Sequence, residues 1–165
     1  MPSFSAKLVE RAPLSPRVER MTFEAERPFE RAAGQYVTLT PDDGVAYAFS
    51  IASPFSARAP GRFDIAVARG TTAAGLLELG PGSVVSVSGP SGALVWKEDV
   101  PALLVATGTG ISPLRAIALE QLERDRTEPL TLLFGCRDAT EELWGGELWR
   151  LALDQPRFHF LPTHS

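Results

Sequence analysis

The stretch of sequence that decides the fold is LLVATGTGISP, residues 103–113. Its first four residues form a continuous apolar run, which is typical of a parallel β-strand buried on both faces. A helix is predicted after the stretch, because apolar residues recur at helical spacing, at Leu114, Ile117, Ala118 and Leu122. We expect Ser112 and Pro113 to begin this helix, as its cap and as a first-turn residue.

The residues between strand and helix, Thr107-Gly108-Thr109-Gly110, have the chemistry of a nucleotide site. Glycines at this position let the backbone turn tightly and approach a pyrophosphate closely. The free N–H groups and the positive end of the following helix would bind the anion. The alternative is a glycine-rich turn that only joins a strand to a helix. Because a strand precedes the motif and a helix follows it, nucleotide binding is favoured.

The chain downstream of this loop continues to alternate between strand and helix. A strand is expected over Leu130–Phe134, an acidic helix from about Thr140 to Ala152, and a third strand over Phe158–Pro162. Gly145-Gly146 lies inside the second of these helices and disfavours it. The order β-α-β-α-β is half of a doubly wound nucleotide-binding sheet.

Upstream of the loop, the pattern consists of short segments of period two, separated by turn clusters. The predicted strands are Ser5–Arg11, Arg17–Ala25, Gln35–Thr40, Tyr47–Ala52, Phe63–Arg69 and Ser83–Ser88. A short helix over Thr71–Leu79 is expected between the last two strands. Many short strands without a long helix indicate an antiparallel sandwich or a small closed barrel.

Composition excludes several classes of protein. The chain has 165 residues, 44% hydrophobic and 22% charged, which is typical of a globular protein of one domain or two small ones. No apolar run approaches the roughly 20 residues of a membrane-spanning helix, and the first residues lack a signal-peptide core, so a cytoplasmic protein is expected. With one cysteine and two histidines, we expect neither a disulfide nor a metal site. A net charge of −4 argues against binding to nucleic acid or anionic membranes.

Four motifs in a fixed order resemble the ferredoxin–NADP⁺ reductase superfamily. They are GQYVTL at residues 34–39, FSIAS at 49–53, VSGPSG at 87–92 and ATGTGISPL at 106–114. The resemblance runs from about residue 5 to the last residue. It implies a six-stranded antiparallel Greek-key β-barrel that binds flavin, residues 1–98, followed by a truncated α/β doubly wound parallel sheet that binds NAD(P), residues 99–165.

The resemblance also implies an activity. In the superfamily a hydride passes from NAD(P)H to the N5 atom of FAD or FMN, and electrons leave singly to an iron–sulfur or haem partner such as a ferredoxin. The chain would then be a flavin-dependent oxidoreductase or an electron-transfer subunit, with its active site completed by another chain in the latter case. The alternative is a non-catalytic, flavin-poor interaction or regulatory module.

Carried over by residue, the resemblance implies that Phe49 lies against the isoalloxazine ring and that Ser50, the candidate catalytic residue, places its hydroxyl beside N5. Ordinary strand alternation is the alternative for both. The other implied flavin contacts are Tyr47, Ser53, the backbone of Val67, Ala68 and Arg69, and the helix-start residues Thr71, Thr72 and Ala73. Those implied for the pyrophosphate of the dinucleotide are Thr107, Gly108, Thr109, Gly110 and Pro113.

Two departures from the superfamily pattern concern the flavin phosphate. Tyr47 stands where relatives have an arginine that grips the phosphate, and Ala73 stands where they have a serine. Each lost contact could weaken binding by about 1.5–3 kcal/mol. Thr71 or Thr72 could substitute for the serine, and Arg69 or Arg58 for the guanidinium.

The third departure concerns the parallel sheet, which relatives continue with further strands beyond the position of Ser165. Leu103–Ala106 is therefore expected at an edge, with its N–H and C=O groups open, and a homodimer or heteromeric partner would cover it by strand addition. Cys136 follows the second strand at the edge where ligands bind, so a redox or nucleotide-side role is one alternative. A small buried residue with a structural role is the commoner case after a strand. The end of the third strand, Thr163-His164-Ser165, has no arginine, which favours NADH over NADPH.

Overall fold

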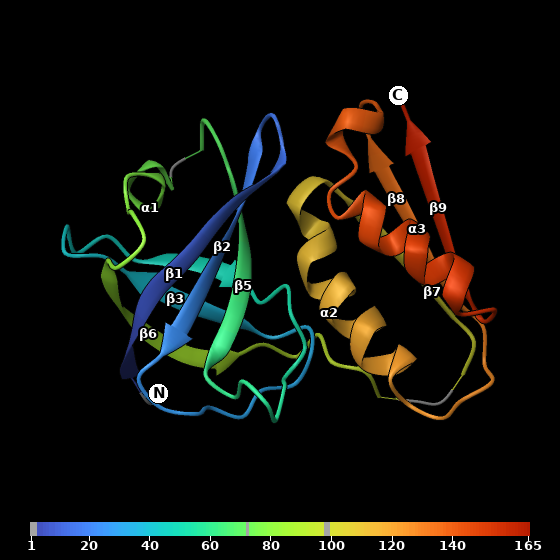
Figure 1. The fold of residues 1–165 in the computed structure, drawn as a ribbon, viewed down its shortest axis with the longest axis horizontal. Coiled ribbons are helices and arrows are strands. Elements are labelled where there is room, and N and C mark those ends of the chain that lie inside the picture. Colours follow the sequence, from blue (N-terminus) through green and yellow to red (C-terminus); the bar gives the residue numbers. More distant parts are fainter. Residues whose placement is uncertain (1–2, 72, 98–99) are drawn as a thin grey trace.

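The computed structural model describes residues 3–71, 73–97 and 100–165, which form two halves that pack against each other (Figure 1). The described part of the first half is an antiparallel sheet with one short helix. Its elements are β1 (Ser3–Ser15), β2 (Val18–Ala25), β3 (Tyr36–Thr40), β4 (Tyr47–Ser50), β5 (Arg62–Ala68), α1 (Ala74–Leu77) and β6 (Val84–Ser91). The predicted domain boundary between residues 98 and 99 lies outside the described residues.

The six described strands of the first half are hydrogen-bonded in the order β4-β3-β6-β1-β2-β5. β-Bulges in β1, between Leu8 and Glu10 and between Pro13 and Ser15, help the sheet to curve. The two ends of the sheet approach each other just beyond β4, where the amide of Ala52 donates to the carbonyl of Asp64 at 2.8 Å. The predicted six-stranded antiparallel fold is confirmed, as a barrel-like sheet whose strand ladder does not close.

Alternating apolar residues of these strands fill the interior of the first half. Phe23 on β2 and Phe63 on β5 are fully buried and stack with ring centroids 5.5 Å apart. Phe29 meets the Phe63 ring edge-on at 5.5 Å. Aromatic pairs of this kind contribute beyond the burial of their area. The period-two pattern of the sequence therefore corresponds to a buried inner face. Parts of β2 and β5 are buried on the outer face too, where Val18 and Ala66 belong to the core cluster of the parallel half.

The second half is a parallel sheet in the order β7-β8-β9 with two helices. Its elements are β7 (Ala102–Thr107), α2 (Ile111–Leu122), β8 (Leu130–Cys136), α3 (Gly145–Asp154) and β9 (Phe158–His164). The predicted β-α-β-α-β order is confirmed. Helix α2 packs on β7 and β8 and is the element that faces the barrel-like half, whereas α3 packs on β9 (Figure 1).

Three local expectations about the helices are wrong. Ser112 is not a cap, because the 3-10 turn Gly108–Gly110 continues directly into α2 and Ser112 is buried in its first turn. The second predicted helix begins only at Gly145, because Trp144 is left-handed at φ 55° and separates α3 from a 3-10 turn at Ala139–Glu141. Helix α1 is shorter than predicted, at four residues.

Strand β7 is at the edge of the described parallel sheet, as expected, but it is not buried on both faces. Leu103 and Val105 are 62% and 59% exposed. Val105, Leu133 and Leu161 are register partners across the three strands, and all three lie on this uncovered face, opposite the buried Ala106. Among the described helices, none has the length and apolar character that crossing a membrane requires.

Candidate functional site

The glycine-rich turn lies where the parallel strands end. Gly108 adopts φ +51°, a left-handed conformation that glycine tolerates far better than other residues. A Cβ atom at Gly108 or at Gly110 would meet nothing within 4 Å, so both residues border open space. This leaves room for a ligand to approach the backbone closely, as the sequence predicts.

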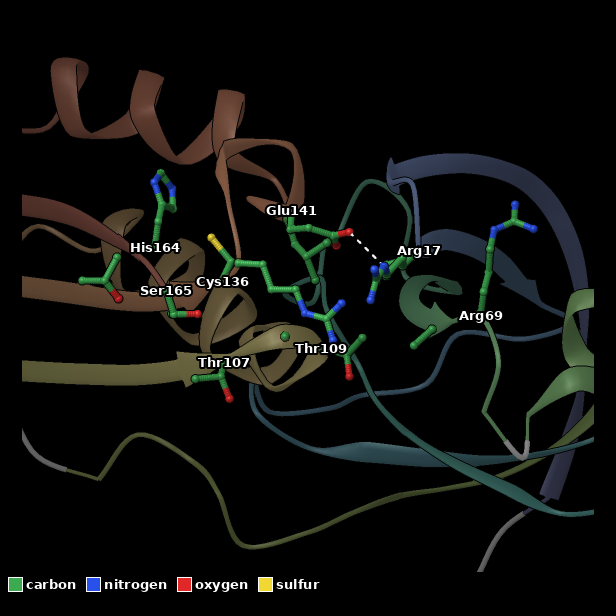
Figure 2. Close-up of a pocket in the computed structure, with 15 residues that line it drawn as sticks. Arg17, Arg69, Thr107, Thr109, Cys136, Glu141, His164 and Ser165 are labelled. Carbon is green, nitrogen blue, oxygen red and sulfur yellow. Dashed lines mark ion pairs between the residues drawn. The ribbon is translucent and has the colours of Figure 1, made fainter.

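A cavity of about 530 Å³ separates this turn from the β1–β2 hairpin of the barrel-like half (Figure 2). Its wall on the side of the parallel sheet consists of Thr107, Gly108, Thr109, Gly135, Cys136, Arg137, Glu141, Leu143, Thr163, His164 and Ser165. The other wall consists of Arg17, Val18, Ala68 and Arg69. Ligands of such sheets bind outside the carboxyl ends of the strands, and the volume is in the usual range for small-molecule sites.

Two polar contacts with Glu141 join the two halves beside this larger cavity. The Ser15 hydroxyl donates to Glu141 at 2.9 Å. The guanidinium of Arg17 lies 3.6 Å from the same carboxylate (Figure 2). Because the Arg17 side chain is 60% exposed, this ion pair is worth little by itself. Together the two contacts join the hairpin to the 3-10 turn at Ala139–Glu141.

A second, smaller cavity of about 270 Å³ adjoins the first. Its lining residues are Ala48, Phe49, Ser50, Ala66, Ala68, Thr71, Thr109, Gly110 and Ser112. Ala68 and Thr109 line both cavities. The fold thus brings the predicted flavin residues Phe49, Ser50, Ala68 and Thr71 next to the predicted nucleotide loop.

Other predicted site residues lie outside both cavities. Val67 and Ala73 are buried in the core of the barrel-like half, Tyr47 packs against that core, Pro113 is buried in α2, and Ser53 accepts a hydrogen bond from the amide of Asp64 at 3.0 Å. Thr72 lies outside the described residues. The role predicted for each of these residues stays a prediction.

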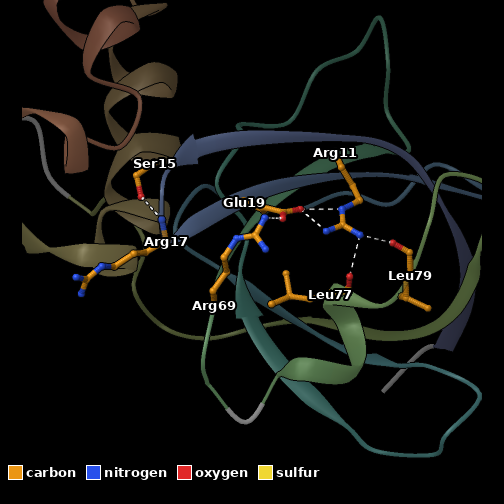
Figure 3. Close-up of polar contacts among 7 residues, drawn as sticks. All are labelled: Arg11, Ser15, Arg17, Glu19, Arg69, Leu77 and Leu79. Carbon is orange, nitrogen blue, oxygen red and sulfur yellow. Dashed lines mark hydrogen bonds and ion pairs between the residues drawn. The ribbon is translucent and has the colours of Figure 1, made fainter.

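A buried carboxylate lies behind Arg69, one of the residues that line the larger cavity (Figure 3). Glu19, 6% exposed, forms ion pairs with both Arg11 and Arg69. Arg11 also donates to the carbonyls of Leu77 and Leu79, at 2.8 and 2.7 Å, and so ties the end of α1 to the sheet. Arg69, one candidate to replace the missing phosphate-binding arginine, therefore already has a carboxylate partner.

The far wall of the larger cavity is acidic around Cys136 and His164. Burial, and then the neighbouring carboxylates Glu142, Asp138 and Glu141, raise the pKa of the Cys136 thiol. The group is thus mostly protonated at neutral pH, which makes it a poor nucleophile. Nε2 of His164 lies 2.8 Å from Glu142, which also accepts a hydrogen bond from Trp149 at 3.1 Å.

Several lining residues were not predicted from the sequence. For Arg137, which follows β8, the position after a parallel strand was a usable signal. For Arg17 and Val18 in the hairpin, and for Glu141 and Leu143, no local signal exists, because they reach the cavity only through the packing of the two halves.

The residues of the smaller cavity fit the ring of a flavin. Phe49 offers an aromatic surface, Ser50 a hydroxyl, and Ala66 and Ala68 leave space beside the strand. The open backbone at Gly108 suits a dinucleotide in the larger cavity, and Gly110 borders the smaller cavity beside it. The position expected to bind the flavin phosphate fits that group less well, because Tyr47 supplies a phenol there and no guanidinium.

The fold combines a barrel-like antiparallel sheet with a parallel sheet, and the glycine-rich turn of the parallel sheet faces the barrel-like half. This combination defines a class of proteins, the two-domain flavin and pyridine-nucleotide reductases. Comparison with known proteins agrees. The oxidoreductase NAD-binding domain family matches residues 104–165. Ferredoxin–NADP reductase B of Sorangium cellulosum is 37% identical over 172 residues, covering 98% of this chain and 70% of that protein.

Two further relatives are longer than this chain. The phenol 2-monooxygenase reductase component DmpP of Pseudomonas is 32% identical over 156 residues, covering 91% of this chain and 44% of that protein. The crystal structure of the Amycolatopsis cytochrome P450 reductase GcoB has 28% identity and a TM-score of 0.89, covering 99% of this chain and 52% of that one. The chain belongs to the ferredoxin–NADP⁺ reductase superfamily.

Proposed function

We propose that this chain is the flavin- and nucleotide-binding part of an oxidoreductase that takes reducing equivalents from NAD(P)H and passes them through FAD or FMN to a redox protein. The observation that carries this proposal is the meeting of the two cavities at Ala68 and Thr109. A ring on Phe49 would there face the mouth of the nucleotide cavity. A bound flavin would supply the conversion of a two-electron hydride into single electrons.

The side chains around this meeting point have distinct roles in the proposal. Phe49 supports the ring by stacking, and the hydroxyl of Ser50 can donate or accept a proton in a hydrogen bond at the ring edge. The backbone of Thr107–Gly110 binds the dinucleotide, and the small side chains of Ala66 and Ala68 leave room for the ring. Orientation of the two rings in this way is the main contribution of a protein to such chemistry.

The end of β9, Thr163-His164-Ser165, has no arginine, and this supports a preference for NADH. Glu142 holds His164 at the end of β9, and Asp138 and Glu141 lie close to Cys136 on the same wall. Glu141 lines the cavity on the same wall and would repel a 2′-phosphate, whereas Arg137, which also lines this wall, acts in the opposite direction. We expect a higher kcat/KM for NADH than for NADPH in a diaphorase assay, and the reverse ratio would contradict this preference.

A partner that covers the edge of β7 is a further part of the proposal. Leu103 and Val105 are more than half exposed beside an unpaired strand edge within the described residues, and such an edge favours strand addition. We expect light scattering to show an assembly that Val105→Lys dissociates. A strictly monomeric protein at high micromolar concentration would contradict it.

The proposed function is tested by visible absorption of the purified protein, alone and after addition of FAD or FMN, followed by anaerobic NADH. We expect flavin bands that bleach with NADH, and a slower bleaching rate for Ser50→Ala. Ser56→Ala is the matched control, because Ser56 is exposed and lines neither cavity. A protein that takes up neither flavin would overturn the proposal and favour a non-catalytic module.

A further inference from the structure

The carboxylate of Asp43 and the phenol of Tyr47 lie against Gly75 on the surface of α1. A Cβ atom at Gly75 would lie 2.7 Å from the Oδ2 atom of Asp43 and 3.0 Å from the hydroxyl of Tyr47. Asp43 belongs to the turn between β3 and β4, and its other carboxylate oxygen accepts a hydrogen bond from the amide of Val45 at 2.9 Å. The carboxylate is thereby held against α1, next to the tyrosine.

Two segments lead away from the proposed ring site, β4 and the chain from Thr71 to α1. The cluster of Asp43, Tyr47 and Gly75 lies where both of them end. Strand β4 runs from Tyr47 to Ser50, and a strand rises about 3.3 Å per residue, so Tyr47 is about 7–10 Å from the lining residues Phe49 and Ser50. On the other segment, Thr71 lines the cavity and α1 begins three residues later. A flavin tail that follows these segments ends at the cluster.

The chemistry of the cluster suits a neutral polyol and disfavours a phosphate. The carboxylate of Asp43 and the phenol of Tyr47 can both accept hydrogen bonds from ribityl hydroxyls. A phosphate dianion would meet the like charge of Asp43. Within the described residues, neither Asp43 nor Tyr47 has an ion pair or hydrogen bond with a cationic side chain.

Two arginines flank α1, Arg69 in the sequence and Arg11 in space, and both are already engaged. Arg69 and Arg11 share the carboxylate of Glu19, and Arg11 also binds the carbonyls at the end of α1. Ala73, at the start of α1, has no hydroxyl, and a helix of four residues has little dipole to offer an anion. Nothing in this cluster therefore compensates the charge of a phosphate.

We propose that the flavin site of this chain does not recognise the flavin phosphate, and that it takes riboflavin at least as tightly as FMN or FAD. The ring and the ribityl chain supply the affinity, so the flavin is an exchangeable ligand. This inference rests on the proposed function, because it takes the smaller cavity as the flavin site.

The test is an equilibrium titration of the full chain with riboflavin, FMN and FAD, followed by quenching of flavin fluorescence. We expect the Kd for FMN to equal that for riboflavin or to exceed it by up to about tenfold. Added salt should tighten FMN binding by screening Asp43 and leave riboflavin binding unchanged. FMN or FAD binding about threefold or more tighter than riboflavin would overturn the inference.

Two variants locate the effect in the cluster. Asp43→Asn should tighten FMN binding about threefold, a modest change because Asp43 is exposed, and should leave riboflavin binding within about twofold. Asp42→Asn is the matched control, with the same change in charge at the neighbouring exposed residue. Equal effects of the two variants would show that net charge alone acts, and would overturn the role of Asp43.

Failure of the inference and failure of the proposed function give different results. If none of the three flavins binds, the proposed function fails together with the inference. If the phosphate-bearing flavins bind best and NADH still bleaches them, the proposed function stands and only the inference fails. Circular dichroism of each variant verifies that it is folded before its titration is compared.

Discussion

The guanidinium of Arg115 on α2 donates to the carbonyl oxygen of Ala52 at 2.5 Å, across the contact between the two halves. The same side chain forms two hydrogen bonds with Glu147 of α3, at 2.6 and 2.7 Å, and lies 4.9 Å from the centre of the Trp144 ring. Ala52 follows Phe49 and Ser50 by only a few residues. One buried arginine thus connects the proposed ring site to both helices of the parallel half.

Substitution of Arg115 should destabilise the whole fold. We expect Arg115→Ala to lower the free energy of unfolding by about 3 kcal/mol, because the carbonyl of Ala52 loses its charged donor and Glu147 its partner. Arg115→Lys should cause more than half of the same loss in the free energy of unfolding, since an ammonium group cannot reproduce the planar fork of the guanidinium. Urea unfolding measures both. A loss below about 0.5 kcal/mol for Arg115→Ala would contradict the role of this contact.

Gly34, in the motif before β3, is expected to tolerate no side chain. Its φ is +97°, and a Cβ atom would lie 1.9 Å from the carbonyl oxygen of Leu94, which is a backbone atom that cannot easily give way. Gly34→Ala should therefore cost more than about 3 kcal/mol or prevent folding. The control is Gly44→Ala, with φ +76° and open space around the added atom, which should cost only about 1 kcal/mol. Similar thermal midpoints for the two variants would refute the clash.

Gly108 should matter for the ligand more than for the fold. Because a Cβ atom at Gly108 would meet nothing within 4 Å, Gly108→Ala should cost only the roughly 1 kcal/mol of a left-handed alanine. The added methyl group borders the larger cavity, where the dinucleotide is proposed to approach the backbone. We expect NADH binding to weaken by about tenfold or more in a calorimetric titration. Gly44→Ala, with the same kind of strain outside the cavity, should bind NADH normally.

The reactivity of Cys136 should report on the acidic wall. Since burial and the carboxylates Glu142, Asp138 and Glu141 raise the pKa of its thiol, the thiolate fraction at any pH near neutrality is smaller than for a free cysteine. Alkylation by iodoacetamide, followed by mass spectrometry, should be slower than for a free thiol and should level off only at higher pH.

Two variants distinguish the effect of the neighbouring carboxylates on the Cys136 pKa from the effect of burial. Glu142→Gln should speed the alkylation of Cys136 at pH 8, because one carboxylate that raises the pKa is removed. Glu128→Gln should not, since Glu128 precedes β8 whereas Cys136 ends it. NADH should also protect the thiol, because Cys136 lines the larger cavity. Faster alkylation than a free thiol would contradict the direction of the shift.

Much of the fold followed from local patterns. The alternation in the strands that contain Phe23 and Phe63 predicts a buried inner face, and both residues are fully buried. The apolar run before Gly108 predicts a parallel strand that leads into a nucleotide loop. The strands and the tight turn at Gly108 are confirmed, because hydrophobic period and glycine conformation are properties of a few consecutive residues. The nucleotide role of the loop stays a prediction. Phe49 and Ser50 were recognised through their motif, and the structure places both in the smaller cavity.

Other properties of the site depend on residues far apart in the chain. Glu19 engages Arg69 fifty positions away, Asp43 reaches Gly75, and Arg115 binds Ala52, and no local pattern records such pairs. The exposure of Val105 likewise depends on which elements cover the sheet, which its own apolar character does not reveal. The sequence by itself determined the order of the elements and the glycine-rich turn between β7 and α2, because these arise from neighbouring residues. Only the tertiary structure decided which charges are paired and where the two cavities meet, because those relations depend on how curved sheets and helices pack in space.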